Sequence, residues 1–225
     1  MGNILSEELD KRNITRLCHF TKSKNLGHIF NDFDGILATA KIPTPYKDIN
    51  DDSRFDGKPD YVCCSVQYPN LYYLERIINN DLLFRDWTIL CIDPKIILKK
   101  DLLFSKVNAA TEGGKHIKSG ERSFLELFSD KVSTRNSERV RQKTQPSCCP
   151  TDFQAEVLIK EKIPKSYIKG VIVKNEKQAL EEQVRLELLN IKQDISIIIS
   201  PELFSKDVFK KISSGILPSE IIYRK

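Results

Sequence analysis

A carboxylate set into an apolar run is the first candidate for chemistry in this sequence. From Phe153 to Ile159 the residues are mostly apolar or β-favouring, and Pro150 and Asp152 favour a turn before them, so the run predicts a strand entered from a loop. Glu156 is the exception, because glutamate is depleted in strands and burial among apolar neighbours raises a carboxyl pKa. This setting is typical of a catalytic carboxylate. The alternative is an amphipathic strand from which Glu156 points to water.

Three other residues lie where a site could form. His19 falls between a strand-like segment and a helix that Thr21 could cap, and such junctions favour site residues. Arg54 lies in a loop rich in Pro, Asp and Asn, and Tyr72 lies in the first turn of an expected helix. Each has a structural alternative, such as a histidine that hydrogen-bonds within the fold or a tyrosine that packs in the core. The remaining histidines have no such context and are interpreted as structural: His28 and His116.

A cluster of basic residues precedes the strand that carries Glu156. Basic side chains crowded into a turn-rich segment are expected of a loop that follows phosphates, and a solvated basic surface is the alternative. The net charge of +5 permits a polyanionic partner without demanding one. The cluster consists of Lys131, Arg135, Arg139, Arg141 and Lys143.

The apolar pattern predicts short strands and amphipathic helices that alternate along the chain. A charged helix with Ser6 as its N-cap is expected first, and residues 41–59 are expected to form an extended loop. No linker or repeat divides the sequence, so we expect one α+β domain over residues 1–225, with short strands in two packed sheets and flanking helices. Strands are expected at 14–20, 61–66, 88–93, 102–104, 153–159, 170–173 and 195–199, and helices at 21–33, 71–78, 119–128 and 176–189.

The composition is that of a soluble globular protein, with 40% hydrophobic and 30% charged residues. No apolar run is long enough to span a membrane and the N-terminus lacks a signal-peptide pattern, so a cytoplasmic protein without a membrane partner is expected. The six cysteines include two adjacent pairs, which do not match the Cys-x-x-Cys spacing of zinc sites. We therefore expect buried reduced thiols and no metal.

In their order along the chain, several of these segments resemble the DarT family of DNA ADP-ribosyltransferase toxins. No one segment is diagnostic, and the resemblance rests on their collinearity over residues 14–173. The segments are His-Phe-Thr…Asn-Leu from His19, Arg54 before a Tyr-Val…Ser-Val strand, Pro-Asn-Leu-Tyr from Pro69, Asn108-Ala109-Ala110, and Gln154-Ala155-Glu156-Val157-Leu158 followed by Ile163-Pro164.

This resemblance implies an enzyme of the ADP-ribosyltransferase fold that uses NAD as a substrate. The enzyme would attach ADP-ribose to a base of single-stranded DNA (ssDNA), either thymine or guanine. It would be the toxin of a toxin-antitoxin pair, neutralised by an antitoxin protein or an ADP-ribosylglycohydrolase partner. We expect it to act as a monomer.

The resemblance also implies roles for single residues. Glu156 would be the catalytic carboxylate, which stabilises the oxocarbenium-like ribose and accepts a proton from the base. Arg54 would face the diphosphate or the reacting centre, and Tyr72 would stack near the nicotinamide, with Tyr73 as the neighbouring alternative. The riboses and adenylate would be held by His19, Thr21 and Asn25.

Transferases of this kind recognise their substrate with the segment before the catalytic strand. A single strand suits such an enzyme, because a duplex blocks the edge of the target base. Phe128 or Phe153 would stack on an unpaired base. The phosphates would be held by the basic residues Arg135, Arg139, Arg141 and Lys143.

Two other functions stay open on the sequence. A non-catalytic nucleic-acid-binding module could use the same basic segment, 131–143, and a transferase could act on a protein or a small molecule instead of DNA. RNA also stays open as the acceptor, because nothing in the sequence tests for a 2′-hydroxyl.

Overall fold

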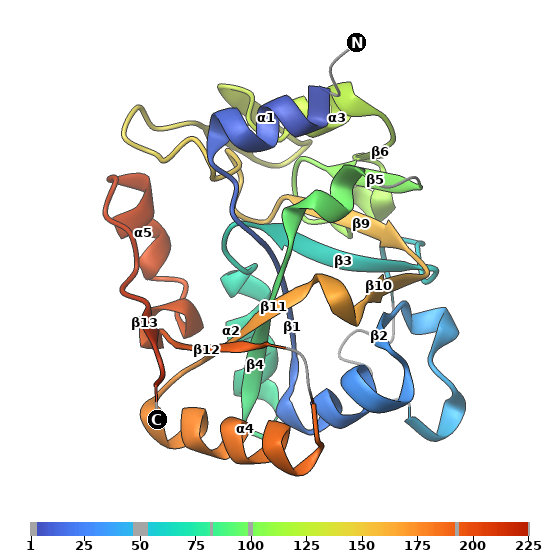
Figure 1. The fold of residues 1–225 in the computed structure, drawn as a ribbon. Coiled ribbons are helices and arrows are strands. Elements are labelled where there is room, and N and C mark those ends of the chain that lie inside the picture. Colours follow the sequence, from blue (N-terminus) through green and yellow to red (C-terminus); the bar gives the residue numbers. More distant parts are fainter. Residues whose placement is uncertain (1–3, 47–53, 82, 99–100, 192–193, 225) are drawn as a thin grey trace.

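The structure, a computed structural model that describes residues 4–46, 54–81, 83–98, 101–191 and 194–224, is built around one large sheet (Figure 1). Neighbouring strands in it are antiparallel except for one parallel pair, which a long helix connects as parallel strands require. In order across the sheet, the strands are β13 (Ile221–Ile222), β12 (Ser196–Ile199), β11 (Ile168–Val173), β4 (Trp87–Ile92), β1 (Leu17–Lys22), β3 (Tyr61–Val66), β9 (Glu156–Lys160), β5 (Leu102–Ser105) and β6 (Ile117–Lys118). The parallel pair is β11 and β12.

Helices cover both faces of this sheet (Figure 1). The helices α1 (Ile4–Arg12), α3 (Glu121–Glu126) and α4 (Glu176–Leu188) contribute to one hydrophobic core, and α2 (Leu71–Asn80) and α5 (Val208–Ser213) contribute to a second. Side chains of β4 alternate between the two, because successive residues of a strand point to opposite faces. Leu90 and Ile92 join the first core, whereas Ile89 and Cys91 join the second.

The sheet comes apart in the middle, between β1 and β3. β1 pairs with β4 along its whole length, from Leu17 to Lys22. It pairs with β3 only at Leu17 and Cys18, after which no further pairs are formed. The two strands therefore leave a gap beside the second half of β1, and the backbone groups that line this gap are available to side chains and ligands.

The expected α+β class is confirmed, and most helices and strands lie close to their predicted positions. The two expected sheets, however, are joined by the short β1–β3 contact into one hydrogen-bonded sheet. Among the described residues, no helix combines the length and the apolar character needed to cross a bilayer.

Several predicted details are wrong for local reasons. The strand expected from residue 153 begins at Glu156, because a turn closed by the Ala155 N–H and the Asp152 carbonyl occupies the preceding residues. Ser6 lies inside α1 and does not cap it. The basic segment is not only a loop, since β7 (Lys131–Ser133) and β8 (Glu138–Val140) form a hairpin within it. The loop expected at 41–59 lies partly outside the described residues.

The position of Gly35 gives a test of this fold. Gly35 begins β2 (Gly35–Leu37), which pairs with β10 (Lys162–Pro164). Its φ is +141°, and a Cβ there would lie 2.1 Å from the Ile163 carbonyl oxygen. We expect Gly35→Ala to lower the free energy of unfolding by roughly 2–3 kcal/mol in urea denaturation.

Gly57→Ala is the matched control, because Gly57 also has a positive φ, +64°, but no atom lies within 4 Å of a Cβ there. It should cost only about 1 kcal/mol, the price of the left-handed backbone. Equal losses in the two variants would show that the close approach of β2 to β10 is absent.

Candidate active site

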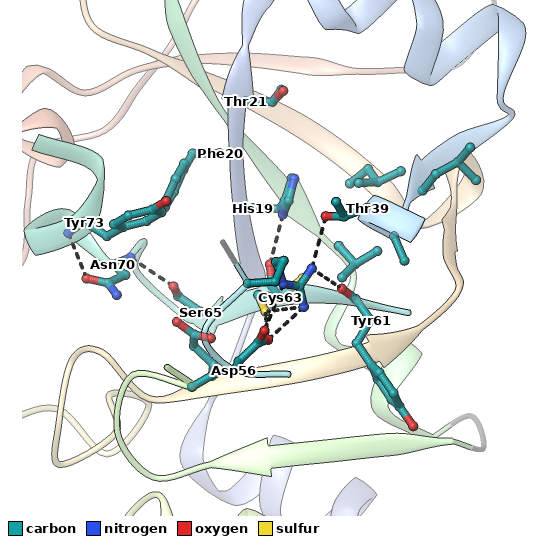
Figure 2. Close-up of a pocket in the computed structure, with 18 of the residues that line it drawn as sticks. His19, Phe20, Thr21, Thr39, Asp56, Tyr61, Cys63, Ser65, Asn70 and Tyr73 are labelled. Carbon is teal, nitrogen blue, oxygen red and sulfur yellow. Dashed lines mark hydrogen bonds and ion pairs between the residues drawn. The ribbon is translucent and has the colours of Figure 1, made fainter. Parts of the chain in front are cut away.

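The gap between β1 and β3 opens into a cavity of about 280 Å³ (Figure 2). Its lining combines polar side chains from β1, β3 and β9 with loops that come from distant parts of the sequence. The residues predicted for the site that line this cavity are His19, Thr21, Asn25, Arg54 and Glu156.

Glu156 lies in the floor of the cavity, at the first position of β9. It is 8% exposed, and in the sheet it lies between Ser65 of β3 and Ser105 of β5. The side-chain amide of Asn108 donates a hydrogen bond to Glu156 Oε1 at 3.0 Å. One carboxylate oxygen is therefore held in place.

Burial raises the pKa of Glu156 to about 7. A hydrogen bond from Cys63 opposes the rise, and the charge of Asp56 adds to it. The carboxyl group therefore changes its charge near neutral pH, where it can act either as a carboxylate or as an acid.

The His19 side chain bridges the gap between the two strands (Figure 2). Its Nδ1 lies 2.9 Å from the carbonyl oxygen of Cys63. A carbonyl oxygen only accepts hydrogen bonds, so Nδ1 carries the proton and Nε2 presents a lone pair. Burial lowers the pKa of His19, which keeps the ring neutral at neutral pH. His19 can therefore accept a hydrogen bond, for example from a hydroxyl group.

Thr21 and Asn25 follow on the same side of the cavity. The Asn25 side-chain amide donates to Thr21 Oγ1 at 3.0 Å. This bond fixes the Asn25 amide and leaves its carbonyl oxygen and the Thr21 hydroxyl hydrogen for other partners. The helix expected at 21–33 is in fact a 3-10 turn, Ser23–Asn25, followed by a π-helical turn, His28–Asp32.

Arg54 lies at the wall of the cavity but points its donors into the protein. Two of them form a bidentate pair with Asp56, at 3.0 and 2.8 Å. Others donate to Thr39 Oγ1 at 3.1 Å and to the carbonyls of Tyr61, at 3.0 Å, and Lys58. Burial would raise the pKa of Asp56, but the Arg54 guanidinium outweighs it and lowers that pKa. The pair therefore fixes the turn 54–61.

A family model described as ssDNA thymidine ADP-ribosyltransferase, DarT, matches residues 18–205 of this sequence. The chain belongs to the DarT family. This membership confirms the family expected from the sequence, and with it the fold and the enzyme class, a transferase of ADP-ribose from NAD to ssDNA.

Solved DarT structures share the fold at low sequence identity. DarT of Thermus sp. 2.9 in complex with ADP-ribosylated ssDNA has a TM-score of 0.61 at 15% identity, covering 85% of this chain and 97% of that one. The same protein in complex with NAD+ has a TM-score of 0.59 at 16% identity, covering 84% and 97%. Thermosipho africanus DarTG in complex with ADP-ribose has a TM-score of 0.55 at 16% identity; the match covers 84% of this chain but 51% of that one, about half its length. A search of curated proteins finds no match.

The tyrosine chosen from the sequence for this DarT site is wrong. Tyr72 does not line the cavity, and its ring packs against Phe209 at 5.4 Å. Tyr73 does line it, with its ring 5.9 Å from that of Phe20. The reason is the start of α2, where the Asn70 side chain caps the Tyr73 N–H at 3.2 Å and so sets the rotation of the helix.

Of the basic residues predicted to hold DNA, the structure leaves three exposed: Arg135, Arg139 and Lys143. Arg141 is half-buried and donates to the carbonyls of Cys149, at 2.7 Å, and Pro146, at 2.6 Å. It therefore stabilises the turn before β9, and the prediction that its guanidinium holds DNA is wrong because both terminal nitrogens already donate to the protein backbone.

The two aromatic rings predicted to stack on a base are also engaged. Phe128 is 6% exposed. The Arg12 guanidinium lies over its ring, with Arg12 Cζ 4.1 Å from the ring centroid. Phe153 stacks on Phe209 at 4.3 Å with an interplanar angle of 9°. Each ring therefore already has a partner within the protein.

Sequence reasoning missed several residues of the site. Asn108 lies in a segment that resembles the family, but the sequence does not indicate its bond to Glu156. Asn70 is 2% exposed and lines the cavity, and its Nδ2 has no hydrogen-bond partner among the described residues. His28, interpreted as structural, also lines the cavity, 4.8 Å from the ring of Tyr46. No group of three or more potential metal ligands occurs within the described ranges.

The raised pKa of Glu156 predicts a pH-dependent stability. The pKa is about 7 in the fold against an ordinary 4.5, so the folded state favours the neutral carboxyl group and loses stability as the pH rises from below 4.5 to above 7. Glutamine is always neutral. At pH 8 the free energy of unfolding of Glu156→Gln should therefore exceed that of the original protein by roughly 2–3 kcal/mol. At pH 4 the two proteins should differ little.

Urea denaturation at both pH values measures this difference. Glu126→Gln is the control, because it makes the same change of side chain at a position on α3 that is only partly buried. A gain from Glu156→Gln that is equal at pH 4 and pH 8 would contradict a buried carboxyl that titrates near neutrality.

Proposed function

We propose that this DarT protein transfers ADP-ribose from NAD to thymine in ssDNA, with Glu156 as the catalytic residue. The observation that carries the proposal is a buried carboxyl group, with a pKa of about 7, oriented by Asn108 in the floor of the cavity. The choice of thymine over guanine is supported by the family description, ssDNA thymidine ADP-ribosyltransferase. The solved Thermus complexes with NAD+ and with ADP-ribosylated ssDNA support NAD and ssDNA as the two substrates.

The reaction replaces one bond at the ribose carbon C1″ with another. The bond to the nicotinamide nitrogen breaks and leaves an oxocarbenium-like ribose, whose positive charge the Glu156 carboxylate stabilises. Thymine N3, the base nitrogen that carries a proton, then bonds to C1″. Glu156 accepts that proton, and its pKa near neutrality suits both roles. In a duplex N3 is paired, which explains the preference for a single strand.

The other residues of the cavity would bind and orient NAD. His19 Nε2 would accept a ribose hydroxyl, next to Thr21 and Asn25. Tyr73, in place of Tyr72, would stack near the nicotinamide. Arg54 would shape the wall through its pair with Asp56, because its donors already have protein partners.

The exposed basic residues of the hairpin, and one that follows it, would hold the DNA phosphates. We assign this role to Arg135, Arg139 and Lys143. We propose that the protein has an antitoxin partner, which is the predicted antitoxin protein or ADP-ribosylglycohydrolase. The name DarTG of the Thermosipho protein supports a second component beside DarT. A single monomeric domain over residues 1–225, acting in the cytoplasm on DNA, completes the proposal.

Labelled NAD and mixed-sequence ssDNA separate the proposal from its alternatives. We expect label on the DNA, at thymine, and a rate that rises with pH to a plateau with an apparent pKa near 7, since only the ionised Glu156 stabilises the ribose cation. Glu156→Ala should lower this rate by about a thousandfold or more while leaving DNA affinity unchanged.

Glu181→Ala, on the exposed face of α4, is the matched control and should transfer at the original rate. A Glu156→Ala enzyme of nearly normal rate would remove Glu156 from its role. DNA that binds but never acquires label would favour the non-catalytic module, and label on protein alone would favour another acceptor.

The hairpin assignment predicts a change in salt dependence. Replacing both Arg135 and Arg139 by alanine removes two phosphate contacts, so the slope of log affinity for ssDNA against log salt should decrease by about 1.4. Fluorescence anisotropy over a range of salt concentrations measures it. Replacing Lys174, just before α4, and Lys177, in its first turn, is the control. The hairpin follows α3 in the chain, and α4 lies at the other end of the molecule from α1 and α3 (Figure 1). Equal slopes for the original protein and the hairpin variant would mean that the hairpin does not contact DNA.

A further inference from the structure

Phe55 is an exposed aromatic side chain at the mouth of the cavity. It lines the cavity and is nevertheless 70% exposed, more than any other aromatic residue of the described chain. It lies between Arg54 and Asp56, whose bidentate pair fixes the turn. Because the turn is fixed and the ring lies beside the cavity, Phe55 presents a flat face on which a planar group that approaches the site can stack.

The Phe55 turn is connected to the basic hairpin by close contacts. A Cβ at Gly114 would lie 2.5 Å from the Asp56 carbonyl oxygen, so the turn 111–114 lies directly against the Phe55 turn. The Glu112 side chain of that second turn accepts a hydrogen bond from the Arg135 N–H at 2.7 Å. The Phe55 turn, the turn 111–114 and the hairpin tip are therefore linked by direct contacts, and we call these three segments the rim.

The rim carries the features that a single strand of DNA requires. Arg135 and Arg139 are exposed on the hairpin for phosphates, and Phe55 is the ring at the other end, beside the cavity. Aromatic side chains next to a basic groove are the usual platform for unpaired bases. The rings of Phe128 and Phe153 already contact Arg12 and Phe209, and neither ring lines the cavity.

We propose that the ring of Phe55 stacks on a nucleobase of the DNA strand where the strand passes from the hairpin to the cavity. The proposal rests on the function proposed above, because it takes ssDNA as the acceptor. It assigns the strand a path, from Arg139 and Arg135 along the rim to Phe55 and then to Glu156. The planar groups of NAD are the other possible partners of the ring, but its exposure places it outside the enclosed part of the cavity.

Fluorescence tests the stacking directly. The chain has one tryptophan, Trp87, and it is 2% exposed, so a Phe55→Trp variant adds one accessible indole to a buried background. Stacking on a base quenches indole emission, and we expect oligothymidylate to quench this variant. Tyr72→Trp is the matched control, since Tyr72 is exposed at 42% but lies outside the cavity, and its emission should not change. The proposal would be overturned if DNA did not quench the emission of Phe55→Trp, or if NAD quenched it and DNA did not.

Kinetics give a second test. Phe55→Ala should raise the KM for ssDNA about 10- to 100-fold, as the loss of one stacked base does, with a smaller effect on the KM for NAD. Phe55→Leu should share the defect and Phe55→Trp should restore affinity, because stacking needs a flat ring and not only apolar area. Tyr72→Ala is again the control.

An equal or larger effect of Phe55→Ala on the KM for NAD would overturn the proposal. A different result would refute the function proposed above, namely that the original protein transfers no label to DNA. The fluorescence measurement does not depend on transfer and still decides whether Phe55 meets a base.

Discussion

The separation of β1 from β3 is the constraint on which the site depends. A strand in the middle of a sheet normally uses both edges for backbone hydrogen bonds, but β1 pairs with β3 only at Leu17 and Cys18. The continuous β1–β4 ladder keeps β1 in place despite this loss. His19 supplies part of the missing pairing, because its ring reaches the Cys63 carbonyl that the ladder leaves unused. The same bond fixes the tautomer that makes His19 an acceptor.

The site also depends on the buried carboxyl group of Glu156, and this burial lowers the stability of the fold. Glu156 lies within the sheet between two serines, and its burial favours the neutral form. The fold tolerates this because Asn108 and the N–H of Ala109 hydrogen-bond the group without neutralising it fully. A stronger cationic partner would remove the cost and also lower the pKa, and the carboxylate would then be a poorer base. Stability and reactivity are therefore set by the same surroundings.

The sequence was informative where function depends on residue type and less so where it depends on geometry. Glu156 was found because a charged residue in an apolar strand is conspicuous. The choice of Tyr72 failed because neighbouring residues on a helix point about 100° apart, and the cap that sets this rotation, Asn70, was not recognised. The two groups that hold Arg141 are backbone carbonyls, and residue types do not show which side chain such carbonyls accept from. The gap between β1 and β3 could not be predicted, because neither strand contains a proline or a glycine that would interrupt the pairing.

The charge of Glu156 has opposite effects on the binding of NAD and on the chemical step. Arg54 and Asp56 form a pair, which leaves Glu156 and Arg76 as the other described charged residues of its lining. Below the pKa of Glu156 the excess charge is positive, which favours the anionic diphosphate of NAD. Above it the carboxylate appears, which stabilises the ribose cation but weakens the attraction for NAD. A rise in pH should therefore raise both kcat and the KM for NAD, so that kcat/KM changes less than kcat alone. An enzyme that bound NAD mainly through a free arginine would not couple the two in this way.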